Sequence, residues 1–139
     1  MHLHEYQAKQ LFRDFGIPVP AGEVVRETKT AAGAADARGG DAWVVKAQVH
    51  AGGRGKGGGV RVVAGREALA TAVNEMLGSR LVTPQTDEEG LPVNSVLIEQ
   101  TVAIGREIYL GMLVDRSSER IMLMASKSGG MNIEEVAAR

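Results

Sequence analysis

The residue pattern most suited to chemistry in this chain is a glycine-rich loop that carries two cations. Arg54 and Lys56 stand among the glycines Gly52, Gly53, Gly55, Gly57, Gly58 and Gly59. Because glycine lacks a Cβ, backbone N–H groups in such a loop can turn toward an anion and approach it closely. Arginine and lysine add charge and further donors for phosphate oxygens. The pattern indicates a flexible cover over the phosphates of a nucleotide.

The elements on either side of the loop decide which kind of phosphate loop it is. Strand patterns precede it at 43–46, ending in Lys46, and follow it at 60–63. The Gly53-x-Gly55-x-x-Gly58 string matches the dinucleotide fingerprint, but that site requires a helix after the loop. A Walker A loop fails because His50 and Gly57 stand where it needs glycine and serine or threonine. A strand, a loop and a strand also cover ATP in protein kinases, but here the lysine precedes the loop and no His-Arg-Asp follows. A different ATP-binding fold is indicated.

Two other interpretations of the loop stay open at this point. Glycine loops also form mobile hairpin tips, and Gly-Arg-Gly-Lys-Gly is a short basic tract of the kind that binds RNA. The RNA interpretation is the weaker one, because the tract is single, no aromatic residues lie nearby for stacking, and the net charge of the chain is −1.

A second candidate group consists of a carboxylate within the strand pattern at 96–102 and another just beyond it. Glu99 lies near the end of that apolar run, and Glu107 opens the next strand after a short linker. Backbone groups of such a linker can bind an adenine edge, and a carboxylate just beyond can accept both ribose hydroxyls. Alternatively, Glu99 and Glu107 are solvated strand ends, and Lys46 is open to the same interpretation.

The composition limits the class of protein. The chain has 139 residues, of which 44% are hydrophobic and 24% charged, as in one globular domain with a modest core. It has no cysteine, which excludes disulfides and thiolate metal sites and fits a reducing compartment. No apolar run approaches the ~20 residues that span a bilayer, and no signal peptide is recognisable. We therefore expect a cytoplasmic protein with neither membrane nor nucleic acid as partner.

Helix and strand patterns both occur along the chain. Helices are expected at 8–15, ended by Gly16 and Pro18, from a Thr28 cap to about residue 38, and at 66–77. Leu69, Ala72, Val73 and Met76 form the inner face of the third helix. Strands are expected at 23–25, 43–46, 60–63 and 93–100, with an exposed loop at 84–92.

The last part of the chain predicts a hairpin and the beginning of a helix. The strands of the hairpin are expected at 108–114 and 120–125, with a polar tip between them. Asn132 and Glu135 are spaced as a capping box that opens a final helix. Since that helix has barely begun when the sequence ends at Arg139, we expect the chain to be a fragment of a longer protein.

Three segments carry a family resemblance. The strings at 3–9, 43–56 and 114–118 resemble β subunits of the succinyl-CoA synthetase (succinate–CoA ligase) family, and the likeness runs from Met1 to Arg139 without an obvious gap. The resemblance implies an ATP-grasp fold of the α+β class, in which two α+β subdomains hold a nucleotide between them. About 1–100 would be the first subdomain and about 101–139 the start of the second, with the C-terminal remainder absent.

The resemblance also implies a role for each candidate residue. Lys46 would contact the nucleotide phosphates, and the phosphate loop would be Gly53, Arg54 and Gly55. The adenine linker would include Glu99 and Val102, and Glu107 would hold the ribose. No catalytic residue and no metal ligand is expected in this chain, because the ligands of Mg²⁺ would follow residue 139. The histidine that is phosphorylated would belong to the α subunit, and so would be none of His2, His4 and His50.

The activity that the resemblance implies is the coupling of ATP/ADP phosphoryl transfer, through that phosphohistidine, to succinyl-CoA formation or cleavage in the citric acid cycle. The partners would be the α subunit, in a heterodimer or heterotetramer, and ATP, CoA and succinate as substrates. A malate–CoA ligase β subunit and a non-catalytic nucleotide-sensing module remain alternatives. We expect the 139 residues alone to be inactive.

Overall fold

The computed structural model describes residues 2–127 and residue 129. Contacts between residues divide the chain into two compact units, Met1–Val102 and Ala103–Arg139. Helices and strands occur together in the first unit, and the second contains a hairpin. The predicted α+β class is confirmed. No helix among the described residues is long and apolar enough to cross a membrane.

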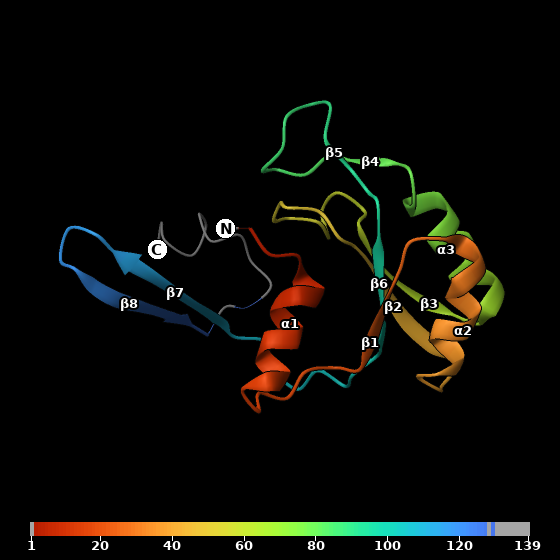
Figure 1. The fold of residues 1–139 in the computed structure, drawn as a ribbon, viewed down its shortest axis with the longest axis horizontal. Coiled ribbons are helices and arrows are strands. Elements are labelled where there is room, and N and C mark those ends of the chain that lie inside the picture. Colours follow the sequence, from red (N-terminus) through yellow and green to blue (C-terminus); the bar gives the residue numbers. More distant parts are fainter. Residues whose placement is uncertain (1, 128, 130–139) are drawn as a thin grey trace. The chain divides into compact units, whose positions relative to one another are not determined.

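The first unit is built on an antiparallel sheet of four strands in the order β1-β6-β2-β3. Figure 1 shows two helices on one face of this sheet and the N-terminal helix on the other. The strands are β1 (Gly22–Val25), β2 (Ala42–Ala47), β3 (Val60–Ala64) and β6 (Val96–Gln100), and the helices are α1 (Glu5–Asp14), α2 (Ala31–Asp36) and α3 (Arg66–Met76).

The hydrophobic core lies between the sheet and helices α2 and α3. Side chains alternate between the two faces of a strand, so every second residue of β2 and β6 points toward these helices. Val45 and Ile98 are fully buried there. The four residues predicted for the inner face of α3 are all buried, which confirms both the helix and its orientation (Leu69, Ala72, Val73 and Met76).

Helix α1 lies on the other face of the sheet without entering a core. It begins at Glu5 and ends at Asp14, followed by Gly16 with φ +72°, so the predicted helix is confirmed. None of its residues is buried, and Phe15 just beyond it is 82% exposed. The apolar spacing that predicted the helix therefore does not lead to burial among the described residues.

Three expected boundaries are wrong. Thr28 does not cap an α-helix but opens a short 3-10 turn, η1 (Thr28–Thr30), and α2 begins only at Ala31. The predicted loop at 84–92 ends in a strand, because β5 (Leu91–Pro92) pairs with β4 (Arg80–Leu81). Strand β6 begins at Val96, three residues later than expected.

The second unit contains the expected hairpin. Strands β7 (Tyr109–Asp115) and β8 (Arg120–Ser126) pair in antiparallel register. At its tip, the Asp115 carboxylate accepts hydrogen bonds from Ser117 N at 3.0 Å and from the Ser117 and Ser118 hydroxyls at 2.7 Å. These bonds explain why the polar tip forms a tight turn. The helix expected at Asn132 and Glu135 lies outside the described residues.

The glycine loop, residues 48–59, is folded into turns and packed against the segment at 81–85. Gly52 N donates to Gln85 Oε1 at 2.6 Å. Gly53 has φ +70°, a conformation that side chains other than glycine rarely adopt. A Cβ on Gly57 would overlap the carbonyl oxygen of Val82. Part of the glycine content therefore serves close backbone packing.

The packing of Gly57 predicts a selective loss of stability. We expect Gly57→Ala to lower the free energy of unfolding by about 1–3 kcal/mol, because the new methyl group meets rigid backbone. Gly55→Ala is the matched control, since a Cβ on Gly55 meets nothing within 4 Å. Urea unfolding of the two variants measures the difference, and equal stabilities would contradict this account of the loop.

Candidate phosphate-binding site

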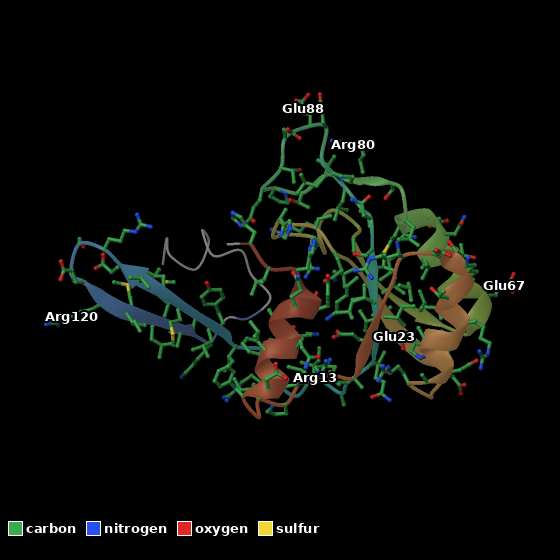
Figure 2. The ribbon with its side chains drawn as sticks, viewed as in Figure 1. Arg13, Glu23, Glu67, Arg80, Glu88 and Arg120 are labelled. Carbon is green, nitrogen blue, oxygen red and sulfur yellow. The ribbon has the colours of Figure 1, made fainter. Side chains whose placement is uncertain are left out.

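Five charged side chains gather between α1 and the sheet, and we call them the charge cluster. Figure 2 shows side chains from both elements extending into this space. Each member forms at least one ion pair within the cluster, and each is at most 21% exposed. The members are Glu5 and Lys9 from α1, Lys46 from β2, Arg54 from the glycine loop and Glu99 from β6.

Strand register brings Lys46 and Glu99 together. In the β2–β6 pair, Lys46 lies opposite Leu97, so Glu99 is its diagonal neighbour on the same face of the sheet. Lys46 Nζ lies 2.6 Å from Glu99 Oε2, and the Glu99 side chain is only 1% exposed. On the next strand, a Cβ on Gly22 would come within 2.7 Å of Glu99 Cγ. Gly22 therefore leaves room for the buried carboxylate.

Arg54 folds back from the glycine loop onto the end of β2. Its NH1 donates to the Ala47 carbonyl at 2.7 Å, and its NH2 lies 2.7 Å from Glu5 Oε2. The loop supports this position, because Gly59 N donates to the Arg54 carbonyl at 2.8 Å. Arg54 and Lys46 consequently approach the same carboxylate from two different elements.

The turn that carries Arg54 also presents backbone donors. Lys56 N and Gly57 N both donate to the Gly53 carbonyl, at 3.0 and 3.3 Å, as in the first turn of a helix. Within residues 2–127, no hydrogen bond is formed by the backbone N–H groups of Gly53, Arg54 and Gly55. Consecutive N–H groups of this kind form a favourable environment for an anion.

Helix α1 places Glu5 between the two cations. Tyr6 N donates to Gln48 Oε1 at 3.2 Å, and Gln48 is itself buried at the end of β2. Gln48 in turn donates to the Lys46 carbonyl at 3.1 Å. These bonds fix the first turn of α1 beside Lys46, and Glu5 Oε1 lies 3.0 Å from Lys46 Nζ.

The electrostatics follow from these contacts. Burial alone would raise the pKa of Glu5, but the charges of Lys46 and Arg54 outweigh it and lower this pKa to about 2. For Lys46, burial would lower the pKa, but hydrogen bonds and charge interactions with Glu99 and Glu5 outweigh it and raise the pKa. Both groups are therefore fully charged at neutral pH.

The structure brings together three of the site residues that were predicted from the sequence. Lys46, Arg54 and Glu99 meet in the charge cluster, and Gly53 and Gly55 flank Arg54 in the turn. The alternative that Glu99 is a solvated strand end is wrong, because it is buried. Val102, at the end of the first unit, is 58% exposed, and Glu107 in the second unit is exposed as well.

Two members of the cluster were not predicted, Glu5 and Lys9. Their spacing was an available signal, since residues four apart lie on one helix face, and Lys9 Nζ lies 3.0 Å from Glu5 Oε1. Lys9 also pairs with Glu99. The spacing alone gives no indication that this face meets the sheet, so the link to Lys46 and Glu99 appears only in three dimensions.

Comparison with known protein families identifies the fold. Residues 2–139 match the ATP-grasp domain family, and the chain belongs to that family. A solved structure with a similar fold is that of the dinucleotide-forming acetyl-coenzyme A synthetase 1 of Ca. Korarchaeum cryptofilum, with TM-score 0.64 and 22% sequence identity. The match covers 90% of this chain and 53% of that one.

Two relatives with higher sequence identity are both succinate–CoA ligase β subunits. The chain is 60% identical over 139 residues to the β subunit of succinate–CoA ligase [ADP-forming] from Coxiella burnetii, strain Dugway 5J108-111. It is 59% identical over 138 residues to the protein of that name from Thioalkalivibrio sulfidiphilus, strain HL-EbGR7. These alignments cover 100% and 99% of this chain but 36% of each relative, so the chain spans about a third of their length.

The lowered pKa of Glu5 predicts a pH-dependent contribution to stability. The carboxylate stabilises the fold above its ordinary pKa of 4.5, and this contribution is lost as the pH falls toward about 2. We expect wild type to exceed Glu5→Gln in free energy of unfolding at pH 7. At pH 3 this difference should be smaller by roughly 2 kcal/mol.

Urea unfolding at both pH values checks this expectation. Glu75→Gln is the matched control, because Glu75 forms an exposed ion pair with Arg61 outside the cluster. A wild-type advantage over Glu5→Gln that is equal at pH 7 and pH 3 would show that the cations do not hold Glu5 as described.

Proposed function

We propose that the charge cluster and the turn at 53–55 bind the phosphates of a nucleotide, as part of the β subunit of an ADP-forming succinate–CoA ligase. One observation carries the proposal. Lys46 and Arg54 approach the two oxygens of one carboxylate, at 3.0 and 2.7 Å, beside a turn whose N–H groups donate to no described residue. A phosphate group presents the same kind of paired oxygens to such donors.

The proposed work of these residues is charge neutralisation and positioning. Phosphoryl transfer demands little covalent chemistry from a protein, so donors held in place beside the phosphates make the main contribution. Lys46 and Arg54 would supply two cations, and the turn would supply the N–H groups of Gly53, Arg54 and Gly55. Because the cations are at most 21% exposed, water screens them only partly.

The other candidate residues extend the proposal toward the nucleoside. Glu99 and Val102 would belong to the adenine linker, and Glu107 would accept the ribose hydroxyls. The exposure of Val102 and Glu107 is compatible with ligand contact. Glu99 has a second role in the proposal, because its buried carboxylate holds Lys46 at 2.6 Å.

The division of the chain supports the proposed domain assignment. Met1–Val102 would be the first subdomain of the ATP-grasp domain and the unit from Ala103 the start of the second. We propose ATP/ADP as the nucleotide, an α subunit that carries the phosphohistidine as partner, in a heterodimer or heterotetramer, and CoA and succinate as substrates of the whole protein. The absence of cysteine is compatible with a cytoplasmic location.

Magnesium would accompany the nucleotide and neutralise part of the phosphate charge. The donors of the charge cluster suit phosphate rather than a metal ion, because both of its carboxylates are held by cations. Residues 2–127 bring together no group of three potential ligands for a metal ion. As the family resemblance implies, the proposal assigns the metal ligands to a part of the full-length protein beyond residue 139.

Removal of Lys46 tests the phosphate site. In the full-length protein with its partner chain, we expect Lys46→Ala to raise the nucleotide KM and lower turnover. The combined loss in kcat/KM should be about 10–100-fold, since a hydrogen bond to a charged group contributes about 1.5–3 kcal/mol. Lys29→Ala is the matched control, because Lys29 is 80% exposed and pairs only with the exposed Glu27 among the described residues. Unchanged kinetics in Lys46→Ala would remove this lysine from the site.

The activity itself is tested with the same full-length preparation. ADP release is followed with CoA present and with succinate or malate supplied in turn. Release that depends on CoA and succinate, with a phosphohistidine on the partner chain, is the expected result. A preference for malate would identify the alternative ligase, and ATP binding without CoA-dependent release would indicate a sensing module.

A further inference from the structure

Glu5 occupies the position between the two cations that we assign to phosphate. Its Oε1 lies 3.0 Å from Lys46 Nζ, and its Oε2 lies 2.7 Å from Arg54 NH2. One carboxylate thus bridges a lysine and an arginine through separate oxygens, as two oxygens of a phosphate group would. A phosphate and this carboxylate therefore compete for the same donors.

The remaining contacts of the two cations bind them to the sheet. Lys46 also holds Glu99 at 2.6 Å, and Arg54 also donates to the Ala47 carbonyl at 2.7 Å. These bonds fix the cations at the end of β2 whatever occupies the space between them. An arriving anion therefore finds the cations in place and needs only the donors that now face Glu5.

Electrostatic repulsion opposes the presence of the Glu5 carboxylate and a phosphate group in this space at the same time. The cluster holds three cations and two carboxylates, a small positive balance that a phosphate group of about two negative charges reverses. Glu5 stays ionised at neutral pH, so it and a phosphate between the same cations would repel each other at short range.

Helix α1 offers Glu5 a route out of the site. Lys9 Nζ lies 3.0 Å from Glu5 Oε1 on the same helix and can keep this carboxylate paired after it leaves Lys46 and Arg54. No residue of α1 is buried, so a shift of the helix opens no hydrophobic core.

We propose that Glu5 is an internal counter-ion that nucleotide phosphates must replace, and that it thereby sets the affinity and the ligand selectivity of the phosphate site. The inference rests on the proposed function and adds to it a residue that opposes binding. Glu5 weakens binding of every ligand that carries phosphates and leaves adenosine unaffected.

Calorimetric titration of the full-length protein and its partner chain tests this inference. The ligands are ADP, inorganic pyrophosphate and adenosine, and the proteins are wild type and Glu5→Gln. We expect the Kd for ADP and for pyrophosphate to fall at least about 10-fold in Glu5→Gln, since the charge-assisted contacts of the Glu5 carboxylate with Lys46 and Arg54 no longer have to be broken. The Kd for adenosine should not change, which separates competition from a general disturbance of the fold.

Two further variants complete the experiment. Glu75→Gln makes the same charge change outside the cluster and should leave all three affinities as in wild type. Glu5→Asp keeps the charge but shortens the side chain, so that the carboxylate no longer bridges both cations well. It should tighten ADP binding by a smaller factor, and it keeps the inference testable if Glu5→Gln does not fold.

The outcomes separate the two proposals. If wild type binds ADP, and neither Glu5→Gln nor Glu5→Asp binds it more tightly, the Glu5 inference fails and the proposed function stands. Weaker ADP binding by Glu5→Gln would likewise overturn it, and would make Glu5 a residue that positions Lys46 and Arg54. If neither wild type nor the Glu5 variants bind ADP or pyrophosphate, both proposals fail.

Discussion

The arrangement of the first unit depends on a carboxylate that is buried on one face of the sheet. Glu99 is 1% exposed, and a buried carboxylate is tolerated only when cations and hydrogen bonds replace water. Lys46 comes from the neighbouring strand and Lys9 from α1, so this single requirement links the sheet to the N-terminal helix. Glu5 and Arg54 then extend the network into the glycine loop.

The two faces of the sheet consequently have different physical characters. The face toward α2 and α3 is a conventional hydrophobic core, in which fully buried residues such as Val45 and Ile98 stabilise the unit. The face toward α1 carries the charge cluster, and α1 is held there by ion pairs and by Tyr6 and Gln48 rather than by buried apolar surface. A hydrophobic core on one face of the sheet thus supports a charged network on the other.

The glycine loop is closely packed and also presents free backbone donors among the described residues. Gly57 packs closely against the backbone of Val82, and Gly52 N donates a hydrogen bond to Gln85. The loop is therefore packed against the segment at 81–85. The turn at 53–55 nevertheless leaves backbone donors unused by residues 2–127. The sequence pattern indicated phosphate binding for this loop, and the structure assigns some of its glycines to close packing.

The sequence by itself determined the local elements. The spacing of apolar residues predicted α3 and its buried face, and short apolar runs predicted β2, β3 and the β7–β8 hairpin, because such patterns are properties of neighbouring residues. Residue type and position also marked Lys46 and Arg54 as candidate phosphate contacts. Only the tertiary structure decided that Glu5 and Lys9 join them, since α1 and β2 are separated by about thirty residues along the chain. The pairing of Lys46 with Glu99 likewise depends on strand register, which no short stretch of sequence specifies.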